Sequence, residues 1–128
     1  MNKQTAAALI ALLFSIGLIA GSALAAKNEN VYTSVTTGKR MVVNFNIQQA
    51  RKKAESDALG IAVQNAYSSL LPNQVLAENL EFFYDVILPM TKDFIITYKV
   101  LSGIETRGHY LVGVESKVDL RLLEKKLT

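Results

Sequence analysis

The alternation of apolar and polar residues divides the chain into strand-like and helix-like segments. From residue 39 to residue 47, Val43, Phe45 and Ile47 alternate with polar or less buried positions, which predicts a β-strand. Residues 27–37 are polar and rich in β-branched side chains, and we expect a mobile or edge-like segment there. The first regular element is therefore expected to begin near residue 40.

The longest helical pattern begins near Ile47 and ends at Pro72. Asn46 is a candidate N-cap residue, and Gln49 stands at the capping-box position three residues later. Successive positions four apart advance by about 400° around a helix, so small residues at this spacing form a slowly drifting ridge. That ridge consists of Ala50, Ala54, Ala58, Ala62 and Ala66.

This alanine ridge lets another element approach the helix closely. We expect the apolar face of a C-terminal β-hairpin to cover it, and an exposed groove for a partner is the alternative. A membrane span is excluded for this helix because Arg51, Lys52, Lys53, Glu55 and Asp57 occupy its first turns.

Residues 73–88 favour a second helix that ends at Pro89. One stripe of a helix would carry Leu76, Leu80, Phe83 and Ile87. The shorter run 82–88 is also compatible with a buried strand, because periodicity does not distinguish helix from strand in short apolar runs.

Two strands and a short helix are predicted after residue 93. Gly103 suits a β-bulge and Gly108 suits a turn residue with positive φ, so the segments around them form an antiparallel hairpin. Asp119 is the candidate N-cap of a helix that reaches Leu127. The apolar faces are expected to be Phe94, Ile96, Tyr98 and Val100 on the first strand, and Tyr110, Val112, Val114 and Val118 on the second.

These elements predict an α+β fold. A small antiparallel sheet, made of an N-terminal strand and a C-terminal β-hairpin, packs against the long alanine-rich helix and the second helix. We expect residues 40–128 to form a single domain, with residues 26–39 as a flexible N-terminal segment.

Residues 1–25 have the pattern of a secretory signal peptide. Lys3 precedes an apolar run from Ala6 to Ala20, and Ala23 and Ala25 supply small residues for cleavage after position 25. A retained membrane anchor is the alternative, although the run is short for a span of about 20 residues. We therefore expect export, with no stable transmembrane span after cleavage.

Composition narrows the function classes. Without Lys3 the chain carries 13 basic and 11 acidic residues, a balance too mild to indicate nucleic-acid binding. The chain has no cysteine and a single histidine, His109, so thiolate nucleophiles, disulfides and most metal sites are ruled out. No catalytic constellation, cofactor motif or metal-binding motif is found, and we expect a protein that is not an enzyme.

Five basic or titratable residues are candidate contacts for a partner. Arg51, Lys52 and Lys53 could touch anionic lipid or an acidic protein, or simply form a solvated first turn. Arg107 and His109 flank Gly108 in the predicted hairpin turn, where a solvated histidine is the simpler interpretation.

Three tyrosines are candidates for stacking on a ligand such as a glycan. Tyr84 belongs to the predicted second helix, whereas Tyr98 and Tyr110 fall on apolar strand faces. Packing in the core or at an interface is the simpler use for Tyr98 and Tyr110.

The order of these features resembles the N-terminal domain of flagellar assembly protein T, a periplasmic family associated with the flagellar basal body. The resemblance covers about residues 40–127, and family members continue into further domains. Its residues are Ala50, Ala54, Asp57, Ala58, Leu59, Ala62, Val63 and Ala66, followed by Phe94, Ile95, Tyr98, Val100, Leu101, Tyr110, Val112, Val114 and Val118.

The resemblance implies an α+β domain that resides in the periplasm and has a structural role, and here we expect it as a stand-alone version of that domain. It carries over no catalytic residue. We therefore expect a non-enzymatic structural or assembly protein that binds protein partners in the cell envelope, among them the flagellar basal body, or assembles with itself. A periplasmic module that binds a small ligand or glycan is the alternative.

The alanine ridge gives a first test. Replacing Ala58 by leucine should overpack the contact beneath the helix and lower the free energy of unfolding by about 1–3 kcal/mol. Thermal denaturation of the variant measures this loss, and an unchanged melting temperature would contradict close packing at Ala58.

Overall fold

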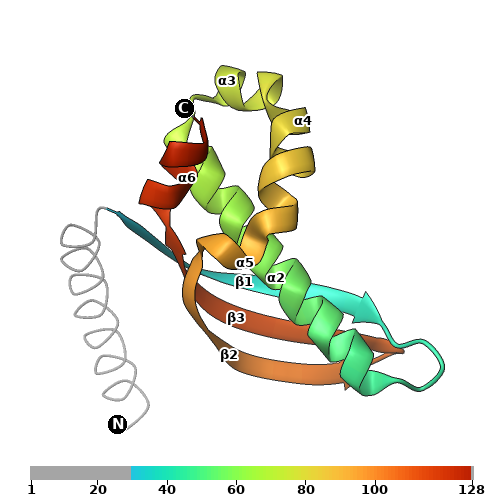
Figure 1. The fold of residues 1–128 in the computed structure, drawn as a ribbon. Helices are drawn as coiled ribbons and strands as arrows, with labels where there is room; N and C mark the ends of the chain where they lie inside the picture. The colour runs from blue at the N-terminus through green and yellow to red at the C-terminus, as the bar shows by residue number, and fades with distance from the viewer. Residues whose placement is uncertain (1–29, 128) are drawn as a thin grey trace, which may run out of the picture.

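A computed structural model describes residues 30–127 and shows a three-stranded antiparallel sheet with helices against one face (Figure 1). The strands β1 (Val31–Met41), β2 (Ile95–Thr106) and β3 (His109–Asp119) stand in the order β1-β3-β2. The long helix α2 (Ile47–Leu70) runs across this sheet. The α+β fold is confirmed, whereas the predicted signal peptide lies outside the described residues.

The N-terminal strand lies earlier in the chain than predicted. It occupies Val31–Met41, so the interpretation of residues 39–47 as a strand was wrong beyond Met41, and residues 31–39 are paired rather than flexible. Residues 42–46 form a tight connection in which Asn44 and Phe45 have φ of 53° and 60°. Positive φ is incompatible with an extended strand, so the alternation of Val43, Phe45 and Ile47 did not reflect a sheet face.

Helix α2 has the predicted boundaries and the predicted buried ridge. The Asn46 side chain accepts a hydrogen bond from the backbone N–H of Gln49 at 3.1 Å, which caps the helix. All five ridge alanines are buried. The ridge therefore faces the interior, as the small side chains indicated.

The ridge rests on β1 and β3 rather than on the whole hairpin. Thr36 of β1 donates a hydrogen bond from Oγ1 to the carbonyl oxygen of Ala58 at 2.6 Å. At Gly38 the two backbones meet, since an added Cβ would overlap the Ala54 carbonyl oxygen and lie 2.7 Å from its carbonyl carbon. On β3, Val112 and Val114 pack with Leu59 in a buried cluster.

Residues 73–94 are helical apart from the turn residue Asn79, which excludes the strand alternative for residues 82–88. They comprise α3 (Asn73–Glu78), α4 (Leu80–Phe82), a π-helical turn (Phe83–Ile87), a 3₁₀ turn (Leu88–Met90) and α5 (Thr91–Phe94). Pro89 does not end the helical path as predicted. It lies at the start of the 3₁₀ turn, a position at which a helical turn tolerates proline.

The hairpin closes more tightly than predicted. Only Arg107 and Gly108 connect β2 to β3, and both have positive φ, 51° and 78°, as a two-residue hairpin turn requires. The expected positive φ of Gly108 is confirmed. The register irregularities fall between Ile95 and Thr97 and between Val100 and Ser102, so Gly103 is not itself the bulge position.

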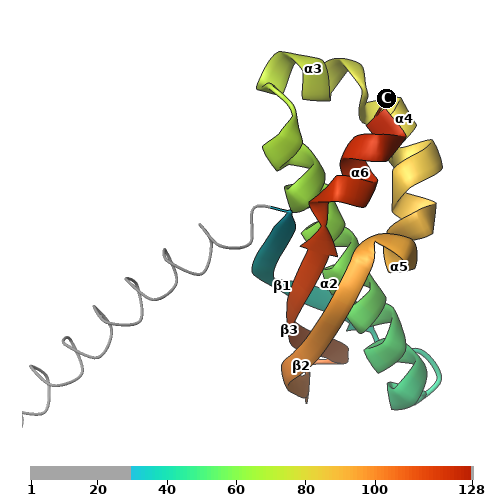
Figure 2. The same ribbon diagram turned by 60° about the vertical axis from the view of Figure 1, so that its left-hand side comes forward.

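Helix α6 (Leu120–Leu127) begins at the predicted cap. The Asp119 carboxylate accepts hydrogen bonds from the backbone N–H groups of Arg121 and Leu122 at 3.0 and 3.1 Å. Leu123 of α6 enters the main core with Tyr67, Phe83 and Phe94. Figure 2 shows α3, α4 and α6 gathered around the C-terminal half of α2, so this core lies at one end of the molecule.

The close approach at Gly38 predicts an asymmetric effect of two glycine substitutions. Gly38→Ala should lower the free energy of unfolding by about 1–3 kcal/mol, because its methyl group would collide with the backbone of α2. Gly113→Ala in β3 is the matched control, since its Cβ would lie 3.3 Å from the mobile hydroxyl of Ser102. Equal melting temperatures for the two variants would contradict the backbone contact.

Candidate functional site

The structure brings the five basic or titratable residues that were predicted as partner contacts to one end of the molecule, whereas Tyr84 lies elsewhere. Arg51, Lys52 and Lys53 lie in the first turns of α2, and Arg107 and His109 flank the β2–β3 turn. Both segments lie at the end of the sheet that is farthest from α3 and α4 (Figure 1). We call residues 41–47, 51–53 and 107–109 together the tip.

Backbone hydrogen bonds join the two halves of the tip. Met41 pairs with His109 across the β1–β3 ladder, and the N–H of Val42 donates to the carbonyl oxygen of Gly108 at 2.8 Å. The chain then reverses within a few residues, because the N–H of Asn46 donates to the carbonyl oxygen of Val43 at 3.0 Å. This reversal places the start of α2 beside the hairpin turn.

The connection 42–46 exposes apolar side chains. Phe45 is 97% exposed at the apex, and Met41, Val43 and Ile47 around it are also exposed. The positive φ of Phe45 adds strain, because a side chain with a Cβ is disfavoured in the left-handed region. Neither the exposure nor the strain of Phe45 contributes to the stability of the fold.

The sequence pattern did not identify these apolar residues as an exposed surface. Their alternation from Met41 to Ile47 predicted a strand face, and the intervening Asn44 and Asn46 were the available warning. Asparagine tolerates positive φ and caps helices, which are the two roles it has here.

The cations of the tip and the neighbouring Arg40 differ in their partners. Arg40 forms a bidentate ion pair with Asp57, at 2.5 and 2.9 Å, and this carboxylate raises the pKa of Arg40 above its usual value. Arg51 donates to the Gln48 side chain at 2.6 Å. Lys52 and Lys53 are exposed beside them.

His109 and Tyr84, the remaining candidate residues, each contact residues that lie close to them in the sequence. His109 Nδ1 lies 3.2 Å from the carbonyl oxygen of Arg107, an acceptor that holds the proton on Nδ1. Tyr84 lies on the π-helical turn, away from the tip, with its ring edge-on to Phe83 at 5.4 Å between centroids. Within residues 30–127 no three His, Asp or Glu side chains are grouped for metal binding.

The three tyrosines do not share a hollow surface. Tyr98 lines a groove of about 590 Å³ between α2 and β2, together with Lys52 and Lys92. The Tyr110 hydroxyl instead lies over Gly103 on β2, at 2.6 Å from where a Cβ would be, and Tyr84 is exposed on its helical turn.

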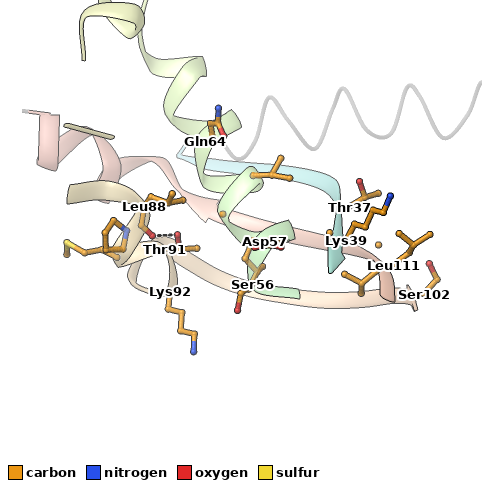
Figure 3. A pocket seen from close by; sticks show the side chains of 18 of the residues that line it. Thr37, Lys39, Ser56, Asp57, Gln64, Leu88, Thr91, Lys92, Ser102 and Leu111 are labelled. Atoms are coloured by element: carbon orange, nitrogen blue, oxygen red, sulfur yellow. Dashed lines mark hydrogen bonds between the residues drawn. The ribbon is translucent and has the colours of Figure 1, made fainter. Parts of the chain in front are cut away.

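A larger hollow of about 1370 Å³ extends along α2 (Figure 3). Leu88, Thr91 and Lys92 line one part of it, where Thr91 Oγ1 donates to the Leu88 carbonyl oxygen at 2.6 Å. Its lining also includes Leu111 and Val112, which are successive residues of β3 and point to opposite faces of the sheet. The hollow is therefore an open surface depression and not an enclosed ligand pocket.

Two further findings complete the description of the site. Over the part of the chain that the structure describes, no helix has both the length and the apolar character needed to cross a membrane. A comparison of the sequence with models of known protein families found no match, and a comparison with curated proteins found none either.

The strain at the apex of the tip generates a prediction. Phe45→Gly should keep or raise the melting temperature, because glycine adopts positive φ freely and Phe45 buries nothing. Asn46→Ala, one residue later, should lower the free energy of unfolding by about 1 kcal/mol through loss of the helix cap. A large loss of stability in Phe45→Gly would show that the ring packs on the fold.

Proposed function

We propose that the chain is a non-enzymatic assembly domain of the bacterial cell envelope, exported through residues 1–25 and acting in the periplasm. The flagellar basal body is the machinery to which the resemblance of residues 40–127 points. The observation that carries an assembly role is the uncovered edge strand β2.

Strand β2 is long, apolar and open to a partner. It has 12 residues and pairs on one side only, with β3, so its other edge presents unpaired backbone groups. Helix α2 lies over β1 and β3 and meets β2 only at its start, where Ile95 packs on the cluster that contains Leu59, so almost all of the rest of β2 is exposed. Five large apolar residues of β2 are exposed: Ile96, Tyr98, Val100, Leu101 and Ile104.

An added strand from a neighbouring protein would satisfy both features at once. Its backbone would pair with the free edge of β2, and its side chains would cover Tyr98 and Val100, which share the face that α2 occupies. The bulges in β2 reduce edge pairing, but they do not remove the exposed apolar surface. This geometry favours protein assembly over the glycan alternative, since the tyrosines do not converge on a pocket.

The proposal predicts that the protein co-purifies with hook–basal bodies from a flagellated host that expresses it. Val100→Lys places a charge on the uncovered face of β2 and should reduce the bound amount at least tenfold. Val35→Lys is the matched control, because Val35 is an exposed valine on β1, the opposite edge of the same sheet. Quantitative immunoblotting of the purified basal-body fraction measures both variants.

Two results would contradict this proposal in different ways. Absence of the wild-type protein from basal bodies would overturn the flagellar assignment. Normal recovery of Val100→Lys would overturn the role of the β2 edge.

A further inference from the structure

The tip carries a second surface, independent of β2, and we propose that it binds the anionic surface of a phospholipid bilayer, with Phe45 inserted among the lipids. The apolar apex supplies the inserting group, and the surrounding cations supply the attraction to anionic headgroups. This assignment follows from four features of the tip.

The first feature is the apex itself. Phe45 is almost fully exposed, and the positive φ of Asn44 and Phe45 holds it outward at the turn. Strained backbone outside the core is a reason to look for a function at that position. Exposed Met41, Val43 and Ile47 extend the apolar surface around the ring.

The second feature is the charge beside the apex. Arg51, Lys52 and Lys53 lie one turn into α2, and Lys39 and Arg107 are exposed on the strand side. Clustered lysines and arginines bind anionic lipid headgroups, and each cation near the surface adds to the attraction. Apolar insertion combined with a basic patch is the two-part pattern of peripheral membrane binding.

The third feature is the shape of the tip. The apolar residues lie on a projecting connection and not in a groove. A partner that buries them must therefore deform around them, and a fluid bilayer can do so.

The fourth feature is access. Helices α3, α4 and α6 all lie toward the other end of the molecule (Figure 1), so a flat surface can contact the tip without contacting them. A bilayer therefore fits the tip better than an acidic protein does.

The experiment uses the exported, processed protein and vesicles of phosphatidylcholine with or without 30% phosphatidylglycerol. We expect at least tenfold tighter binding to the anionic vesicles in a sedimentation assay, and weaker binding as salt is raised. Phe45→Gly, which relieves strain and removes the ring, should weaken this binding at least tenfold.

Charge variants test the basic part of the tip. The double variant Lys52→Gln with Lys53→Gln should weaken binding to anionic vesicles several-fold and flatten its salt dependence. Asp57→Asn releases Arg40 from its ion pair and should strengthen binding. Lys117→Gln, on the outer face of β3 near its far end, is the matched control and should bind as the wild type does.

Insertion can be followed directly because the protein contains no tryptophan. Phe45→Trp should show a blue-shifted emission with anionic vesicles, whereas Val35→Trp, exposed on β1, should show none. Absence of the shift, or wild-type binding by Phe45→Gly, would overturn the proposal. A shift with envelope proteins and none with vesicles would overturn it in favour of a protein partner. Val100→Lys should bind vesicles normally, which separates this result from the role of β2.

Discussion

At Gly38 the backbone of β1 touches the backbone of α2, because neither Gly38 nor the facing Ala54 has a side chain long enough to separate them. The buried hydrogen bond from Thr36 to the Ala58 carbonyl oxygen lies one helical turn further along and fixes the same approach. Helix α2 is thereby held low over β1 and β3. A helix in that position leaves the face of β2 bare, so the uncovered strand is a consequence of the alanine ridge.

The position of α2 over the sheet also gives the two halves of this helix different packing partners. The C-terminal half of α2, from Ala62 onward, packs with the helical segments and α6 around Tyr67 and Phe83, whose ring centroids are 5.0 Å apart. Burial raises the pKa of Tyr67, whose hydroxyl has no hydrogen-bond partner among the described residues. The N-terminal half of α2 packs mainly on the sheet, where Ala54, Ala58 and Leu59 meet Val112 and Val114. The tip has no core of its own, because the buried aromatic residues Tyr67, Phe83 and Phe94 lie at the other end.

Much of this fold was predictable from local patterns, and the failures have a common physical cause. Helix α2, its cap at Asn46 and the cap of α6 at Asp119 depend on interactions within a few residues, and the buried face of β3 is visible in the alternation of Val112, Val114 and Val118. The position of β1 depends on pairing with β3 almost 80 residues away, which the pattern near Val43 does not encode. The exposure of Tyr98 and Val100 likewise depends on where α2 lies. The alternation of apolar and polar residues within β2 does not show whether a helix covers that face.

The candidate site could likewise be predicted only in part, because local sequence patterns do not show which distant residues lie together. Arg51, Lys52 and Lys53 were identifiable as a basic triplet, and Arg107 and His109 as a hairpin turn, but nothing local indicated that they share one end. The pairing of Met41 with His109 brings them together, and the connection 42–46, which carries Phe45, leads from that pair into α2. A charged triplet alone is compatible with a solvated helix. When the same charges lie beside an exposed, strained aromatic residue, the surface they form together is complementary to a bilayer, which has anionic headgroups over an apolar interior.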